Sequence, residues 1–283
     1  MVKLPLNLSK ALDAWKEVSA KADRSASVVL AGDERLVELA QHQFSVGGTV
    51  PATWVGPLAE LSGLPSVPGE VWVVLLPPER EAEVLATLRQ AVPKGGAVVA
   101  VDEGSGATGN VTYPSKGLAR VSFSDSPAGW RQVFGSCADV AGDHTVALGR
   151  RYPAIRAVAA RRVIDRTAGQ NALIGLVFIL PGADMPAMTL NQIKMVLSIA
   201  SIYGEKIDLD RAVELAGVVG MGFGFRALSR LLVRSTPGLG WVLKAVTGYT
   251  ATMAVGLGAV HYFEKGAPAS TSRVVALAST LKS

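Results

Sequence analysis

The chain has 283 residues, of which 49% are hydrophobic and only 18% are charged, whereas a typical soluble domain carries about 25% charged residues. The net charge of +5 is unevenly distributed: residues 1–148 contain 12 Lys and Arg against 16 Asp and Glu, and residues 149–283 contain 16 against 7. The only cysteine, Cys137, excludes an internal disulfide and a cysteine-based metal centre. The three histidines show no ligand spacing, so we expect neither a metal nor a cofactor.

The basic second half is also the more apolar one. Modules that bind nucleic acid are usually polar around their basic patches, whereas the arginines here separate long apolar runs. A membrane is therefore a better predicted partner than a nucleic acid. Charges interrupt the first residues, which excludes a signal peptide there, and we expect the first domain to lie in the cytoplasm.

Residues 1–142 have the pattern of an α/β domain. Helices are predicted at 8–22, at 34–44 after the first strand, and at 80–92 after the third. Continuous apolar strands separated by helices are typical of a mostly parallel sheet covered on both faces, as in Rossmann-like folds. The predicted strands are 27–31, 52–55, 71–76, 97–101 and 118–123.

The turn after the first strand lacks a phosphate-binding motif. A P-loop needs GxxxxGK[ST], but this turn reads Gly32-Asp33-Glu34-Arg35, and Glu38-Leu39-Ala40 occupies the place of the Lys and Ser/Thr. The two acidic residues would repel a phosphate, although they suit the start of a helix. A Rossmann GxGxxG is absent as well, so we expect no nucleotide hydrolysis and no enzymatic activity.

Two weaker candidates remain in this half. Asp102-Glu103 follows the fourth strand, where α/β folds present functional groups, and the alternative is a solvated loop. The Gly/Ser/Thr-rich segment 104–114 is predicted to be a mobile loop.

From residue 143 the chain becomes basic. Pro153 suits the first turn of a helix, and 153–180 is predicted to form one long helix whose arginines contact lipid phosphates at a membrane surface. The alternative is a solvated face, or a face docked on the acidic first domain. The arginines are Arg150, Arg151, Arg156, Arg161, Arg162 and Arg166.

Four apolar runs follow one another, and only the last approaches the length of a membrane span. The runs 168–180, 193–204 and 213–225 are too short, while 245–263 has no formal charge and is the predicted span. Small residues four apart, as in Thr252/Gly256 and Ala254/Gly258, allow close helix packing in lipid. The alternative is a soluble helical core, in which glycine also permits close crossing.

Four motifs occur in order in this half: YPAIRAVAARRVIDRTAGQNALIG (152–175), PGADMPAMTLNQIKMVLSIASIYG (181–204), GFGFRALSRLL (222–232) and PGLGWVLKAVTGYTATMAVGLGAVHYFEKG (237–266). Together they resemble the bacterial family of domains of unknown function numbered 697, of the YcjF type. In that family the domain commonly follows a GTP-binding domain. The resemblance therefore implies that residues 1–142 are a degenerate GTPase-like domain, in which Val101-Asp102-Glu103-Gly104 stands in place of the base-reading NKxD motif.

The resemblance also defines a set of motif residues in an apolar helical domain at 143–268, followed by a tail at 269–283. The polar ones lie on apolar elements, so we expect them to hydrogen-bond to one another or to mark a site. The prolines and glycines are expected to begin and end helices. The set is Asn171, Pro181, Gly182, Asp184, Pro186, Gln192, Gly222, Gly224, Arg226, Pro237, Gly238, Trp241 and Lys244.

These observations favour a non-catalytic adaptor on the cytoplasmic face of an anionic membrane, either peripheral or with a span at 245–263. Its α/β domain would bind a protein partner, and the resemblance suggests a GTPase. One alternative is a soluble nucleotide-binding or GTPase-related protein with an unorthodox site near Gly32, Asp102 and the 104–114 loop. Another is a soluble scaffold that forms homo-oligomers.

Overall fold

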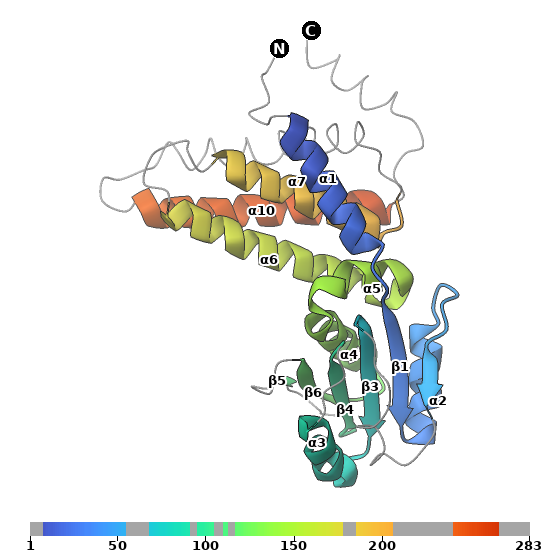
Figure 1. Cartoon of the computed structure of the whole chain (residues 1–283). Coiled ribbons are helices and arrows are strands. Elements are labelled where there is room, and N and C mark those ends of the chain that lie inside the picture. The colour runs from blue at the N-terminus through green and yellow to red at the C-terminus, as the bar shows by residue number, and fades with distance from the viewer. Residues whose placement is uncertain are drawn as a thin grey trace.

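The protein consists of an α/β layer below and a layer of long helices above it (Figure 1). The computed structural model describes residues 8–54, 68–90, 95–104, 110–112, 117–177, 185–205 and 240–265. Residues of both halves pack in one continuous hydrophobic core, so the two layers share buried contacts.

The α/β layer contains a six-stranded sheet in the order β2-β1-β3-β4-β6-β5. Five neighbouring strands are parallel, and the short edge strand β5 runs antiparallel to β6. The sequence predicted the five parallel strands and the mixed α/β class. The strands are β1 (Ser27–Gly32), β2 (Ala52–Trp54), β3 (Glu70–Leu76), β4 (Ala97–Asp102), β5 (Asn110–Thr112) and β6 (Leu118–Phe123).

Helices cover both faces of this sheet. The alternate strand residues Val28, Leu30 and Val73 face α2 (Glu34–Phe44) and α4 (Pro127–Val140). Their neighbours pack against α3 (Glu81–Gln90), which follows the short 3₁₀ helix η2 (Pro78–Arg80). Burial on both faces explains why the strands are apolar throughout rather than alternating.

A bridge of short helices joins the sheet to the upper layer. It consists of η3 (Gly142–His144), α5 (Thr145–Arg151) and η4 (Pro153–Ile155). Between α5 and η4, the hydroxyl of the buried Tyr152 accepts a hydrogen bond from the backbone N–H of Val28, 3.0 Å away. This bond ties the bridge to the amino end of β1.

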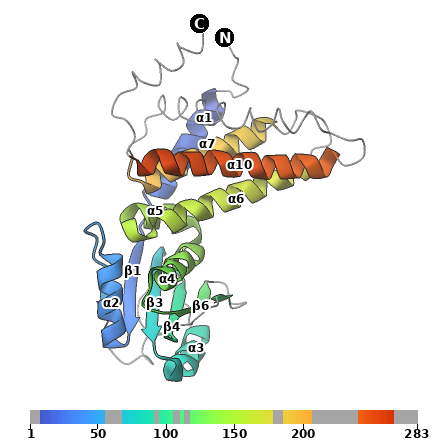
Figure 2. The ribbon, with the colours of Figure 1, turned by 180° about the vertical axis from the view of Figure 1, so that it is seen from behind.

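The upper layer is built on α6 (Arg156–Val177), α7 (Met185–Ile202) and α10 (Gly240–Glu264), with α1 (Leu8–Ala22) against α7. Figure 2 shows α6 and α10 running side by side. A Cβ on Gly256 would lie only 2.5 Å from Cγ1 of Ile164, so glycine is what allows α10 to approach α6 this closely. Gly256, one of the small residues predicted to allow close helix packing, therefore lies at a helix crossing inside the protein.

The predicted span at 245–263 is corrected by the structure. It lies within α10, and no helix in the described ranges is long and apolar enough to cross a membrane. Threonine, tyrosine, glycine and His261 dilute the apolar residues of this helix, which explains why a run without formal charge still falls short.

Four further elements differ from the sequence-based prediction. The segment 104–114 was predicted to be a loop, yet Asn110–Thr112 form β5. The helices α4 and α5 were not predicted at all. The predicted helix 153–180 begins as a 3₁₀ turn and continues as α6 from Arg156 to Val177, while residues 178–180 of the prediction lie outside the described ranges.

Candidate functional site

The carboxyl edge of the sheet is the first candidate, because doubly wound sheets bind ligands there. Gly32 ends β1 with φ +124°, and a Cβ at this position would lie 1.9 Å from the Leu75 carbonyl oxygen. The next N–H, that of Asp33, donates to the same carbonyl at 2.9 Å, and the Asp33 carboxylate accepts from Leu36 N–H at the start of α2. Two of the N–H groups at this turn, those of Asp33 and Leu36, are thus bonded within the chain itself.

Arginines form ion pairs with Asp102, the last residue of β4, and with Glu103, the residue after it. Arg35 contacts Asp102 at 3.2 Å, and Arg120 contacts Glu103 at 2.5 Å. Arg120 also holds Glu81 through two bonds of 2.9 and 3.0 Å and contacts the Ser122 hydroxyl. The hydrogen bond from Arg120 lowers the pKa of Glu103, which keeps this carboxylate ionised. The edge is therefore a satisfied ion-pair network.

The predicted membrane-surface arginines lie at the junction of the two layers, and most contact the protein's own acceptors. Arg150 contacts Asp23 at 2.9 Å, Arg162 contacts Asp139 at 2.6 Å and Arg166 reaches Asp143 at 3.9 Å. These acids belong to the acidic first half, as the docked-face alternative expects. The others vary: Arg161 pairs with Asp165, Arg151 donates to the Ala26 carbonyl, and Nε of Arg156 is buried without a hydrogen-bond partner. Their contact with lipid stays a prediction.

Asn171 and Gln192, which were expected to hydrogen-bond to one another or to mark a site, share a partner in the helical layer. Both donate side-chain hydrogen bonds to the Thr252 hydroxyl, at 2.8 and 3.2 Å. Asn171 also donates to the Met188 carbonyl and accepts from Asn191, while Thr252 donates to the Gly248 carbonyl. Asn171 and Thr252 are fully buried, so this cluster fixes how α6, α7 and α10 pack together.

The remaining predicted residues either lie in the first turns of helices or fall outside the residues that the structure describes. Pro186 is the second residue of α7, so it begins that helix as predicted. Trp241 and Lys244 lie in the first turns of α10. Outside the described ranges lie Pro181, Gly182, Asp184, Gly222, Gly224, Arg226, Pro237 and Gly238. Cys137 is fully buried in the core, where burial raises the pKa of its thiol.

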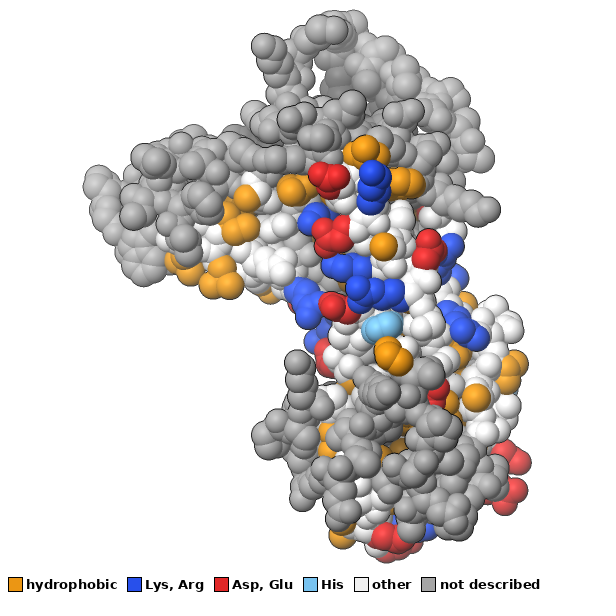
Figure 3. Space-filling model, in the orientation of Figure 1, with side chains coloured by type: hydrophobic (Ala, Val, Ile, Leu, Met, Phe, Trp, Pro, Cys, Tyr) orange, Lys and Arg blue, Asp and Glu red, His pale blue; other side chains and the backbone are white. Residues whose placement is uncertain are grey.

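Large apolar side chains are exposed on both α6 and α10. On α10, Val246, Tyr249 and Leu257 are 48%, 40% and 47% exposed and fall within a sector of about 80° at 100° per residue. Leu173 and Leu176 of α6 are 62% and 39% exposed. Figure 3 shows hydrophobic side chains on the near side of the projecting part of the helical layer, the side on which α10 lies behind α7. We call these five residues the α6/α10 stripe.

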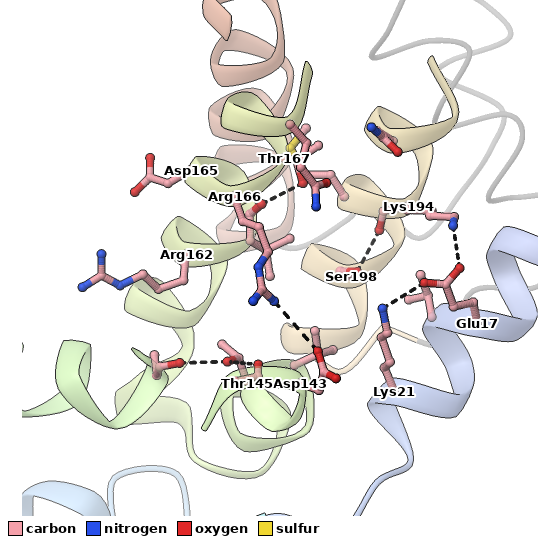
Figure 4. A pocket seen from close by; sticks show the side chains of 18 of the residues that line it. Glu17, Lys21, Asp143, Thr145, Arg162, Asp165, Arg166, Thr167, Lys194 and Ser198 are labelled. Atoms are coloured by element: carbon pink, nitrogen blue, oxygen red, sulfur yellow. Dashed lines mark hydrogen bonds and ion pairs between the residues drawn. The ribbon is translucent and has the colours of Figure 1, made fainter. Parts of the chain in front are cut away.

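A cavity of about 680 Å³ lies where α1, α4, η3, α6 and α7 meet. Its charged lining is mixed, with four basic and four acidic side chains among the described residues. Figure 4 shows Lys21 and Lys194 both directed at Glu17, and Arg166 extending from α6 toward Asp143. The charged lining residues are Glu17, Lys21, Asp139, Asp143, Arg162, Asp165, Arg166 and Lys194.

Two carboxylates in this cavity lie in different electrostatic settings. The hydrogen bond from Lys194 and, to a smaller extent, the one from Lys21 lower the pKa of Glu17. Burial raises the pKa of Asp139 in spite of the nearby Arg162 guanidinium. Sequence reasoning missed this cavity, because its walls come from helices far apart in the chain. In the described part of the chain, no group of three or more His, Cys, Asp or Glu is arranged to hold a metal ion.

The comparisons with known proteins identify the helical part. Residues 145–281 match the model of the family described as "Domain of unknown function (DUF697)", so the C-terminal part of the chain is a domain of this family, as the motifs predicted. The match begins at the first residue of α5. No curated protein and no solved structure matches the chain.

Proposed function

We propose that this protein, whose C-terminal part is a DUF697 domain, is a non-catalytic adaptor that docks on an anionic membrane through the α6/α10 stripe. The observation that carries the proposal is that α10 is apolar on two opposite faces. Ala251, Val255 and Ala259 are buried, while Val246 and Leu257 on the other side are exposed. Apolar residues on the face of a helix that is not packed in the core favour contact with lipid or with another protein, and large exposed apolar side chains on one face of a helix mark a candidate interaction site.

This proposal changes which residues contact the membrane. Arg150 and Arg162 are held by acidic residues of the protein at 2.9 and 2.6 Å, so the main contact is assigned to the apolar stripe. A helix lying in the plane of the headgroups buries its apolar face without spanning. The net positive charge of residues 149–283 supports the choice of anionic lipid.

We further propose that the α/β layer is a degenerate nucleotide-binding domain that now binds a protein partner. Its five parallel strands follow the doubly wound order 2-1-3-4-5, and Gly32 and Asp33 close the turn where a phosphate would bind. A Rossmann-like, degenerate GTPase origin fits this arrangement. The proposal of a GTPase as the partner rests on the family resemblance.

Flotation with vesicles tests the membrane contact. Full-length protein is mixed with vesicles of phosphatidylethanolamine and phosphatidylglycerol and floated through a density gradient. We expect the wild type to float and the variant Val246→Asp/Leu257→Asp to stay at the bottom. The matched control is Val46→Asp/Val50→Asp, which changes two equally exposed valines of the α/β layer (56% and 60%) and is expected to float.

The same experiment also tests the rival interpretation, a soluble scaffold that forms homo-oligomers. If the wild type stays at the bottom and elutes as an oligomer that V246D/L257D converts to a monomer, the stripe binds a second copy and the membrane proposal fails. If both double variants float like the wild type, the stripe has no part in binding and the proposal fails as well.

A further inference from the structure

In the cavity between α1, α4, η3, α6 and α7, two of the carboxylates are each contacted by two cations. Glu17 is shared by two cations, Lys21 at 2.9 Å and Lys194 at 2.5 Å. Asp143 is also shared by two, Arg24 at 3.7 Å and Arg166 at 3.9 Å. Two carboxylates therefore face four cations, of which Arg24 lies outside the cavity lining.

The other acidic groups of the lining do not reduce this excess. Asp139 is engaged by Arg162 at 2.6 Å. Asp165 accepts two bonds of 2.9 and 3.0 Å from Nε of Arg161, which is not part of the lining. In Figure 4 the Asp165 side chain points away from Arg166. Within the lining, the three cations Lys21, Lys194 and Arg166 thus share two carboxylates, those of Glu17 and Asp143.

The side chains with the least complete pairing are accessible. The distances of 3.7 and 3.9 Å to Asp143 are too long for hydrogen bonds, and 66% of the Arg166 side chain is exposed. Across the cavity, Lys21 and Lys194 are 35% and 32% exposed. Ammonium and guanidinium donors on facing walls suit a ligand with several anionic oxygens.

We propose that this cavity binds a phosphate-bearing ligand, whose oxygens are held between Arg166 of α6 and the Lys21/Lys194 pair of α1 and α7. A cavity of about 680 Å³ lies within the size range of small-molecule sites, about 300–1,000 Å³. It therefore accommodates a molecule larger than inorganic phosphate, either a free phosphate ester or the headgroup of a phospholipid. The site is distinct from the α6/α10 stripe, so it can be tested without a membrane.

Titration calorimetry on the full-length protein tests the proposal with two probes. One is inorganic pyrophosphate, and the other is a short-chain phosphatidylglycerol kept below its micelle concentration. We expect saturable one-to-one binding of at least one probe. A preference for pyrophosphate indicates a soluble ester and a preference for the lipid indicates a headgroup, and both support phosphate recognition.

Matched variants locate the binding. Arg166→Gln and Lys194→Gln each remove one charge-assisted hydrogen bond and are expected to weaken affinity by about tenfold or more. Lys16→Gln removes the same charge from an exposed residue of α1 outside the cavity lining and should leave affinity unchanged. The melting temperature of each variant without ligand verifies that it folds.

Two results would overturn the proposal. One is the absence of saturable binding of both probes by wild-type protein. The other is an equal loss of affinity in K16Q and R166Q, because binding would then follow the overall charge of the surface. Arg166→Lys serves as a rescue variant, since it restores the charge and should recover part of the lost affinity.

Discussion

The sheet layer and the helical layer treat polar and apolar groups in opposite ways. In the sheet layer every residue of β3 after Glu70 is buried and apolar, and the charges lie at its carboxyl edge in completed ion pairs. In the helical layer the buried core contains Asn171 and Thr252, while apolar side chains such as Leu257 remain exposed. A satisfied edge offers little to a ligand, whereas an exposed apolar stripe and an unevenly paired cavity do, so the difference directs the search for function to the helices.

The largest expected effect is a loss of stability in the sheet layer. Gly32→Ala places a Cβ 1.9 Å from the Leu75 carbonyl oxygen at φ +124°, so we expect the free energy of unfolding to fall by about 3–5 kcal/mol. Urea unfolding followed by circular dichroism measures it. Gly48→Ala is the control, since Gly48 has φ +91° but nothing within 4 Å, and its cost should be about 1 kcal/mol. Equal losses in both variants would mean that the contact with β3 is unimportant.

The next prediction addresses the polar core of the helical layer. Asn171→Ala removes the acceptor of the Asn191 amide and one of the two donors to the Thr252 hydroxyl, and we expect a loss of about 2–4 kcal/mol in the free energy of unfolding. Gln170→Ala changes an exposed neighbour and should cost less than about 0.5 kcal/mol. If Asn171→Ala also costs that little, the cluster does not fix the packing of α6, α7 and α10. Urea unfolding measures both variants.

The sheet was more predictable from sequence than the helical layer. Strands buried on both faces are continuous apolar runs, which is why β3, β4 and β6 were predicted nearly to the residue. The strand β5 was missed because Asn-Val-Thr inside a Gly/Ser-rich segment shows no strand pattern. The helix α4 was missed although Ser126 caps it and Pro127 is its first residue, two signals that mark a helix start.

The arginines show what one-dimensional reasoning could not provide. Their number and apolar surroundings suggested a lipid surface, because the sequence does not reveal that Asp23, Asp139 and Asp143 lie beside them in space. Ion-pair partners 20 to 130 residues apart have no local signature. The polar residues Asn171 and Gln192 were expected to hydrogen-bond to one another or to mark a site, because a buried amide in an apolar layer requires a partner. Both instead donate to the hydroxyl of Thr252, which was not among the predicted polar partners.

The smallest expected effects concern the junction between the layers, where two acids should respond to pH with opposite signs. Glu17 has a lowered pKa in the folded state, so its charge stabilises the fold above its ordinary pKa, and this contribution is lost as the pH falls through the folded value. Glu17→Gln should therefore reduce stability at pH 7 by less than about 1 kcal/mol, since the pair is partly exposed. The difference should disappear once the pH has fallen below the lowered pKa of Glu17.

Asp139 provides the reverse case, because burial raises its pKa. Its charged form is disfavoured in the fold, so stability contributed by this group decreases as the pH rises through the interval between its unfolded and folded pKa values. Asp139→Asn should therefore be as stable as the wild type at pH 7 or slightly more stable, by less than about 1 kcal/mol after screening, and the two should converge in acid. Melting temperatures from pH 3.5 to 7.5 measure both variants. A loss at pH 7 in Asp139→Asn would show that the Arg162 ion pair outweighs the cost of burial, and that this junction is held by its charges.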